Sequence, residues 1–169
     1  MKKARDSTTP FETVRWDFNP GRTVLIIIDA QNDFLHVDGW YAQKGIDIGH
    51  MRRTIEPTRL LLKDVRAKNI PVVWTRHGYR GVEDGGPFMQ LRPFLKEGGL
   101  RQDSWGYQIC DELGPREDDW YIDKSRLSAF YNSNLETVLR ALNADTAVSY
   151  THLRAHETDS YLVCRLLLE

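Results

Sequence analysis

An aspartate and a lysine at the ends of predicted strands are the residues best suited to share one site. Asp29 directly follows the apolar run at 23–28, and Lys124 follows the shorter run at 120–123. Parallel strands bring their carboxyl ends to one edge of a sheet, where open α/β sheets bind ligands. There the acid can take a proton from a nucleophile, while the lysine keeps that acid ionised and stabilises developing negative charge. Taken alone, the spacing favours the plainer roles of a turn aspartate and a solvated lysine.

The elements that must position these two residues alternate along the chain. We predict strands at 23–28, 71–75, 120–123 and from 146 onward, and helices at 57–68, 107–113 and 134–142. Pro57 suits the first turn of a helix, Asn69 suits a helix stop, and Asn132 or Ser133 can cap the last helix. Strand, helix and strand in succession predict an α/β fold with right-handed crossovers between parallel strands.

A glycine-rich stretch at 76–104 separates the second predicted strand from the rest of the domain. A loop of this length in a compact domain is typical of a functional segment, so we expect it to set substrate specificity. Arg76, His77 and Arg80 stand at its start and can bind a carboxylate or a carbonyl group. They fit solvated loop charges equally well, and the sequence leaves that choice open.

Composition narrows the classes of partner. The chain has 169 residues, of which 41% are hydrophobic and 28% charged, and its formal net charge is -1. This balance gives no reason to expect a nucleic-acid partner, and no apolar stretch has the length of a membrane span. Two cysteines and a polar N-terminus indicate a reducing, cytoplasmic setting. The sequence has neither a Gly-x-Gly-x-x-Gly nor a Walker loop, so we predict no cofactor, and a phosphoryl-transfer enzyme is the least fitting class.

The two charged residues stand in motifs that resemble those of a known enzyme family. The pattern Asp29-x-Gln31-x-x-Phe34 is similar to the opening motif of the isochorismatase-like cysteine hydrolases, and Lys124-x-Arg126-x-Ser128-x-Phe130 resembles their second motif. The resemblance implies a three-layer α/β/α sandwich with a mainly parallel, Rossmann-like sheet. It also implies an Asp-Lys-Cys triad in which Asp29 and Lys124 are catalytic and a cysteine attacks a carbonyl.

The same resemblance points to residues that contact the substrate. Gln31 and Phe34 match motif positions that line the pocket, and Arg126 belongs to the second motif. Trp105, with Gly106 and Tyr107, looks most like the biuret and ureidoacrylate amidohydrolase branch. This branch implies small ureido or carbamoyl amides as substrates, and the family implies dimers or tetramers. The family's nicotinamidases carry a metal on an aspartate and two histidines.

A metal site is not expected in this chain. Asp47, His50 and His77 could suggest one, but the histidine-rich metal motif is not visible. His50 is expected to be exposed near a helix start.

The family's nucleophilic cysteine has no counterpart where the resemblance places it. It should follow the lysine by some thirty-odd residues, at a turn of small residues, yet 149–158 contain no cysteine. Large apolar neighbours make Cys164 a poor nucleophile, and Cys110 precedes Lys124 in a predicted helix. From 147 the sequence leaves the family pattern, and 149–169 resembles translated sequencing adapter.

We therefore expect three segments in the chain. These are an extended lead-in at 1–22, a partial hydrolase domain at 23–146 and an artefactual tail at 147–169, with the sheet incomplete and the fourth strand at its edge. The favoured interpretation is a truncated cysteine amidohydrolase, inactive as this fragment. The alternative is a natural, catalytically dead relative that acts as a binding or oligomer partner.

Overall fold

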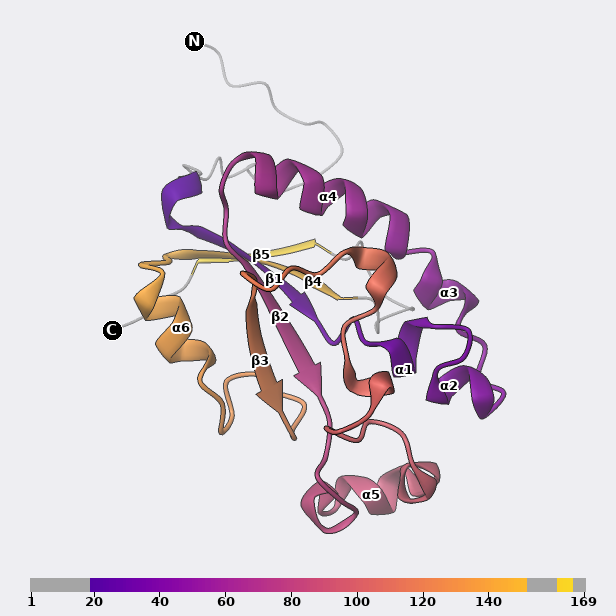
Figure 1. Ribbon diagram of the computed structural model, residues 1–169. Coiled ribbons are helices and arrows are strands. Elements are labelled where there is room, and N and C mark those ends of the chain that lie inside the picture. Colours follow the sequence, from indigo (N-terminus) through magenta and orange to yellow (C-terminus); the bar gives the residue numbers. More distant parts are fainter. Residues whose placement is uncertain (1–18, 152–160, 166–169) are drawn as a thin grey trace, which may run out of the picture.

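A single five-stranded sheet organises the chain. The computed structural model describes residues 19–151 and 161–165. The strands are β1 (Thr23–Ile28), β2 (Val72–His77), β3 (Trp120–Lys124), β4 (Thr146–Thr151) and β5 (Tyr161–Arg165). They lie in the order β3-β2-β1-β4-β5, and the first four are parallel (Figure 1). The predicted α/β fold with a mainly parallel sheet is confirmed.

Helices cover both faces of this sheet. The α-helices are α1 (Asn32–Leu35), α2 (Trp40–Gln43), α3 (Gly49–Arg52), α4 (Ile55–Ala67), α5 (Phe88–Leu91) and α6 (Leu135–Ala141). Short 3-10 turns lie at Pro20–Arg22, Glu83–Gly85, Pro93–Glu97, Trp105–Tyr107 and Asp111–Leu113. Figure 1 shows α4 on one side of the sheet and α6 on the other, which gives the predicted three layers.

Alternation along the buried strands divides the core between these two faces. In β1, Leu25 and Ile27 belong to the core cluster that includes Leu62 and Val65 of α4. The intervening residues of β1 join a second cluster with α6, which consists of Val24, Ile26, Val73, Ile122, Leu135, Val138, Leu139, Ala144 and Ala147. Successive strand residues point to opposite faces, so a strand covered on both sides is apolar along its length, as 24–28 is.

The longest helix follows its sequence pattern closely. In α4, buried Thr58, Leu62 and Val65 recur at helical spacing and face the sheet. The helix begins two residues before the predicted start at Pro57, which stands in the first turn where no N–H partner is required. Asn69 stops it with a left-handed φ of 53°, as predicted.

The last helix also starts near its predicted cap. Ser133 Oγ accepts the N–H of Leu135, at a distance of 3.2 Å, at the start of α6. The other predicted cap, Asn132, instead takes a left-handed φ of 52° in the preceding turn.

The helix predicted at 107–113 is wrong. That segment forms two 3-10 turns, Trp105–Tyr107 and Asp111–Leu113, joined by extended backbone. Ile109 in that extended backbone makes an isolated antiparallel bridge with Gln31, and the Cys110 N–H donates to the Ala30 carbonyl at 2.8 Å. Pairing with the chain after β1 satisfies these backbone groups, so no helix is needed there.

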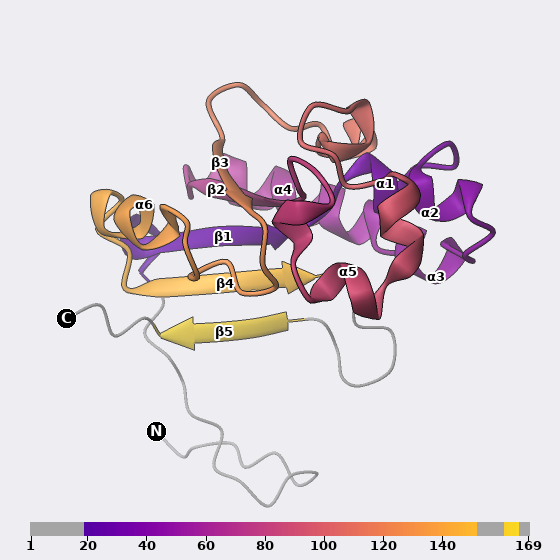
Figure 2. The same cartoon turned by 90° about the horizontal axis from the view of Figure 1, so that it is seen from below.

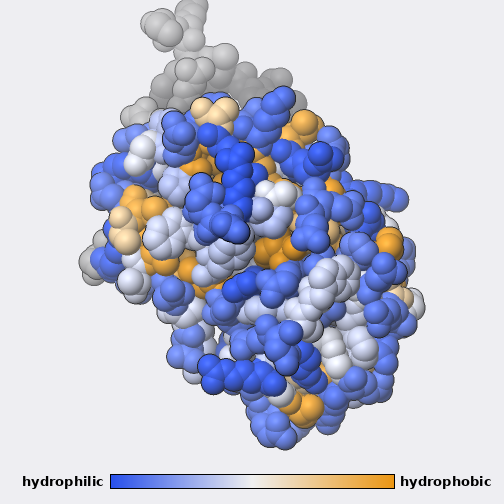
Figure 3. Space-filling view, viewed as in Figure 1, coloured by the Kyte–Doolittle hydropathy of each residue, from blue (hydrophilic) through white to orange (hydrophobic). Residues whose placement is uncertain are grey.

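The edge of the sheet also differs from expectation. β4 is an inner strand, because β5 pairs with it in the antiparallel direction (Figure 2). Residues 147–151 of the predicted tail form most of β4, whereas 152–160 and 166–169 lie outside the described residues. Of the predicted lead-in, residues 1–18 also lie outside them, and Pro20–Arg22 forms a 3-10 turn. No described helix is long and apolar enough to cross a membrane, and hydrophilic side chains cover most of the face in Figure 3.

Candidate active site

Asp29 and Lys124 form a buried ion pair at the carboxyl edge of the sheet. Lys124 Nζ lies 2.8 Å from Asp29 Oδ2, and the two side chains are 1% and 7% exposed. The hydroxyl of Thr75 donates to the other carboxylate oxygen, Asp29 Oδ1, at 2.6 Å. β2 lies between β1 and β3, so the pair lies over the end of β2, where Thr75 supplies the second side-chain contact to the carboxylate. The expected meeting of the two charged residues therefore takes place.

Backbone geometry fixes each partner. Asp29 takes a left-handed φ of 56°, which is uncommon for any residue except glycine. Its N–H donates to the Thr75 carbonyl at 3.1 Å, which ties the turn after β1 to β2. Lys124 Nζ also donates to the carbonyls of Arg126 and Leu127, at 3.3 and 3.2 Å. The ammonium thus has three acceptors for its three N–H groups.

This arrangement suits proton transfer beside a developing negative charge. Each carboxylate oxygen of Asp29 accepts one hydrogen bond from a side chain. Because a carboxylate oxygen has two lone pairs, each can accept one more hydrogen bond or a proton. The lysine charge stays next to the same atoms because its other N–H groups are held by backbone. A general base with an adjacent cation is the combination that activates a thiol or hydroxyl for attack on a carbonyl.

The position for a nucleophile follows from the strand register. Thr151 at the end of β4 pairs with Ile28, so the chain leaves β4 beside Asp29. The next nine residues, 152–160, contain no cysteine and lie outside the described part of the chain. Cys164 lies in β5 opposite Ala147. Cys110 is fully buried in the core on the α4 side, and its burial raises the pKa of the thiol.

His77 also reaches this edge of the sheet. It pairs in register with Lys124, and its ring Nε2 lies 2.8 Å from the Tyr79 hydroxyl. Burial lowers the pKa of His77 to about 4, and the charge of Lys124 acts in the same direction. The imidazole is therefore neutral at neutral pH and can act as a hydrogen-bonding group without adding charge to the ion pair.

Comparisons with known proteins agree with this geometry. The model of the isochorismatase domain family matches residues 23–150, which include all four parallel strands up to the penultimate residue of β4. The chain belongs to the isochorismatase family. The match continues four residues past the predicted end of the domain at 146.

Curated relatives of the chain are named ureidoacrylate amidohydrolases. It is 30% identical over 148 residues to the ureidoacrylate amidohydrolase RutB of Klebsiella pneumoniae, covering 79% of this chain and 63% of that protein. It is 33% identical over 145 residues to RutB of Methylorubrum extorquens, covering 78% of this chain and 58% of that protein. The chain thus spans less than two thirds of the length of these relatives.

Solved structures share the fold. A cysteine hydrolase from Pseudomonas syringae pv. phaseolicola has a TM-score of 0.74 and 30% identity, covering 85% of this chain and 65% of that one. The N-carbamoylsarcosine amidase of Thermoplasma acidophilum has a TM-score of 0.62 at 24% identity, covering 77% and 67%. The second likeness concerns the fold alone.

Two residues of the first family motif hold the scaffold around the pair. Gln31 donates from Nε2 to the carbonyls of His77 and Tyr107, at 3.0 and 2.9 Å, and accepts the His77 N–H at 2.7 Å. Phe34 packs in the core on the α4 side, with its ring edge-on to Tyr41 at 4.8 Å. These contacts occupy the Gln31 amide and bury the Phe34 ring, and a role for either residue in lining the substrate pocket stays a prediction.

Arg76 points away from the ion pair. It stands between Thr75 and His77 in β2, so its side chain projects to the opposite face. There it binds Asp123 at 2.7 Å and Gln108 at 3.1 Å, and its guanidinium lies 5.0 Å from the Tyr107 ring centroid. The structure therefore does not bring Arg76 to the pair, and its role as a substrate ligand stays a prediction.

The other two predicted substrate residues differ in placement. Trp105 is 48% exposed, and its ring packs edge-on against His36 at 4.9 Å. No described contact joins it to the ion pair. Arg126 lies beside the pair, since its carbonyl accepts from Lys124, while its guanidinium donates to the Asp84 carbonyl at 2.8 Å.

Three supporting residues were not predicted from the sequence. The Thr75 hydroxyl donates to the Asp29 carboxylate, and the Tyr79 hydroxyl lies within hydrogen-bond distance of His77. Asp33 is buried and accepts the N–H groups of Trp40 and Leu100, which ties two loops to α1. The signal for Asp33 was its place inside the first motif. No sequence pattern pointed to Thr75, because its contact with Asp29 depends on the register of β2 against β1.

The residues considered for a metal lie apart. His50 is exposed on α3, as expected, and Asp47 caps the N–H of Gly49 at 2.8 Å. His77 is buried at the carboxyl end of β2. Within residues 19–151 and 161–165, no three His, Cys, Asp or Glu side chains are grouped as a metal site would require.

Proposed function

We propose that Asp29 and Lys124 are the acid–base part of a site that hydrolyses the C–N bond of small ureido or carbamoyl amides in a longer parent protein. The observation that carries the proposal is the buried 2.8 Å ion pair beside the end of β4. Burying two charges costs free energy. An aspartate with a purely structural role would not require a lysine from the far side of an intervening strand. Membership of the isochorismatase family adds support.

The chemistry requires one further group, a thiol placed at the end of β4. Asp29 accepts the thiol proton, and the thiolate sulfur bonds to the amide carbonyl carbon. Lys124 stabilises the negative charge that develops beside it. The C–N bond then breaks, the leaving amine takes the proton back from Asp29, and water releases the acyl group from sulfur.

The substrate class is inferred from relatives. Proteins that are 30% and 33% identical are named ureidoacrylate amidohydrolases, which favours ureido amides for the parent. A reactive thiol also fits a reducing compartment such as the cytoplasm, where it does not form a disulfide. We extend the proposal to a homo-oligomeric parent, on the strength of the family resemblance.

The fragment itself is proposed to be inactive. Neither cysteine of the chain suits the role of nucleophile. Cys110 is buried, and Cys164 lies in β5 opposite Ala147. Residues 152–160, which follow β4, contain no cysteine. We propose that the residues beyond the family match at 150 replace the parent's own sequence, so that the nucleophile is missing.

The missing cysteine also supports a second candidate function. A natural relative without a nucleophile would keep Asp29 and Lys124 for binding and would act as a binding or oligomer partner. Such a protein would bind a carbamoyl compound reversibly and release no ammonia.

The test is to extend the reading frame in the source DNA beyond Thr146 and to assay the resulting completed protein. Ammonia release from ureido and carbamoyl amides is measured, with the recovered cysteine changed to alanine as control. Cysteine-dependent activity supports the hydrolase proposal. A reading frame that ends naturally at Glu169, in a protein that binds a carbamoyl compound without turnover, supports the second candidate.

A further inference from the structure

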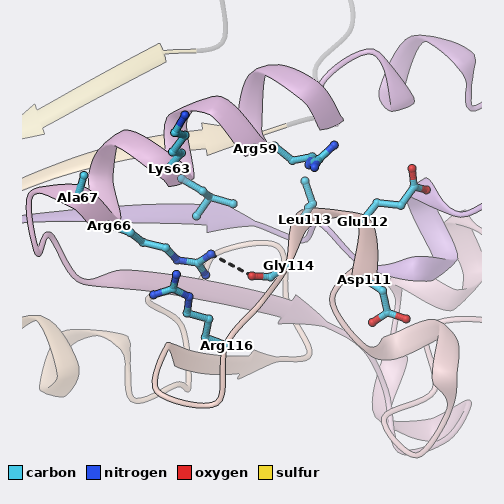
Figure 4. A pocket seen from close by; sticks show the side chains of 10 residues that line it. Arg59, Lys63, Arg66, Ala67, Asp111, Glu112, Leu113, Gly114 and Arg116 are labelled. Atoms are coloured by element: carbon cyan, nitrogen blue, oxygen red, sulfur yellow. Dashed lines mark hydrogen bonds between the residues drawn. The ribbon is translucent and has the colours of Figure 1, made fainter.

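A hollow lies on the α4 side of the molecule, away from the ion pair. It is lined by one side of α4 and by the 3-10 turn Asp111–Leu113 with the coil that follows, and its volume is about 660 Å³ (Figure 4). This volume is in the range of small-molecule sites. Asp29, Thr75 and Lys124 contribute nothing to its lining.

Basic side chains gather in this groove. Arg59, Lys63 and Arg66 recur at spacings of four and three residues, so they project from the same side of α4. Arg116 faces them from the coil. Figure 4 shows the Arg66 and Arg116 side chains close together below Lys63, while the acidic Asp111 and Glu112 stand toward the other end. Like charges at these spacings destabilise a helix unless something compensates them.

Most nearby carboxylates already have cationic partners. Glu112 accepts both guanidinium NH groups of Arg52, at 2.9 and 3.1 Å. Asp119 accepts from Arg66 at 2.7 Å and also from the Trp74 indole at 2.9 Å.

The basic end nevertheless keeps uncompensated charge. Arg59 pairs only with exposed Glu56, at 3.2 Å. Among the described residues, the side chains of Lys63 and Arg116 have no ion-pair partner. The one groove carboxylate without such a partner, Asp111, stands at the acidic end.

We propose that the basic end of this groove binds a small molecule through a tetrahedral dianionic group of the phosphate type. Lys63 and Arg116 supply the uncompensated charge, and guanidinium and ammonium groups both donate to phosphate oxygens from several directions. Leu62 and Leu113 also line the groove, and both are buried in the core beneath it. This site is separate from the proposed hydrolytic one and does not depend on it.

The experiment titrates inorganic phosphate into the ¹⁵N-labelled 169-residue chain at constant ionic strength. Saturable amide shifts are expected at Arg66, Gly114 and Arg116. Lys63→Ala and Arg116→Ala should each weaken the affinity about tenfold, the loss expected for one charge-assisted hydrogen bond.

Arg53→Ala is the matched control. It removes one exposed basic side chain outside the groove and should change the affinity less than about twofold. Shifts that do not saturate would overturn the proposal. So would a loss of affinity in Arg53→Ala equal to that in the groove variants, because it would indicate non-specific attraction.

Discussion

At the scale of single residues, Asp29 holds its position in the ion pair with a backbone conformation that non-glycine residues disfavour. A left-handed φ costs a non-glycine residue roughly 1–2 kcal/mol, and the turn persists because its backbone is bonded on both sides. The Asp29 N–H donates to β2, and its carbonyl accepts the Gln31 N–H at 2.8 Å. The turn therefore aims the carboxylate at Lys124 before any substrate binds.

The Thr75 hydroxyl is expected to contribute measurably to the stability of this site. Thr75→Val removes the donor to Asp29 Oδ1 while keeping the volume, so it should lower the free energy of unfolding by about 1–3 kcal/mol. Thr75→Ser keeps the hydroxyl and should recover most of the loss. Urea denaturation measures both variants, and equal losses would argue against the hydrogen bond as the cause.

Removing the lysine alone should be more costly than removing both charges. Lys124→Met leaves the Asp29 carboxylate buried without its partner and should lower the free energy of unfolding by about 3–5 kcal/mol. The double variant Asp29→Asn/Lys124→Met should lose much less. A double-mutant cycle from urea denaturation gives the coupling, and additive losses would contradict a paired charge.

His77 should make the stability depend on pH. Its pKa is about 4 in the folded chain, against about 6.5 when unfolded, because burial disfavours the charged ring. Between these values the unfolded state binds a proton that the folded state does not. The free energy of unfolding should therefore fall by up to about 3 kcal/mol as the pH drops from about 6.5 to about 4.

Two histidine variants isolate this effect. Denaturation at several pH values should show a smaller decline in His77→Gln than in the parent chain. His50→Gln, at an exposed position, should keep the parent's decline. An unchanged decline in His77→Gln would contradict the assignment.

At the scale of elements, the helical periodicity of α4 separates its buried leucines from its exposed ones. Leu62 is 2% exposed and packs on the sheet, whereas Leu60, on the same helix, is 57% exposed. Leu62→Ala should lower the free energy of unfolding by about 2–5 kcal/mol, because it leaves a cavity. Leu60→Ala should change it by less than about 0.5 kcal/mol. Urea denaturation of the two variants tests the burial, and similar losses would contradict it.

Elements with a strong apolar pattern were predictable from the sequence, and those stabilised by distant pairing were not. The runs predicted as strands at 23–28 and 71–75 correspond to β1 (Thr23–Ile28) and β2 (Val72–His77), because continuous apolar and β-branched residues suit a doubly covered strand. The segment at 107–113 instead follows its bridge to Gln31. Likewise, the pair Asp29 and Lys124 was predictable from strand ends, whereas Thr75 required the register of β2 against β1.

At the scale of the whole molecule, the strand order brings the site together. Asp29 follows β1 and Lys124 ends β3, and β2 between them places Thr75 and His77 beneath the pair. On the other side of β1, β4 delivers the chain to the same edge. One edge of the sheet thus holds the proposed base, its cationic partner and the proposed position for a nucleophile, although these are distant in sequence.

The buried thiol should be unreactive in the folded molecule. Burial raises the pKa of Cys110, so its alkylation by iodoacetamide should be about tenfold or more slower in the native chain than in urea. Peptide mass spectrometry identifies which cysteine is labelled. Rapid labelling of Cys110 in the native chain would contradict its burial and would make it a candidate nucleophile.

The most direct test of the central claim is the effect of Asp29→Asn on ammonia release by the completed protein. If Asp29 is the general base of an amide hydrolase, the substitution should lower kcat/KM by about 10²–10⁴-fold, while the protein remains folded. The 169-residue chain should release no ammonia under the same conditions. Undiminished activity in Asp29→Asn, or turnover by the 169-residue chain, would contradict the account.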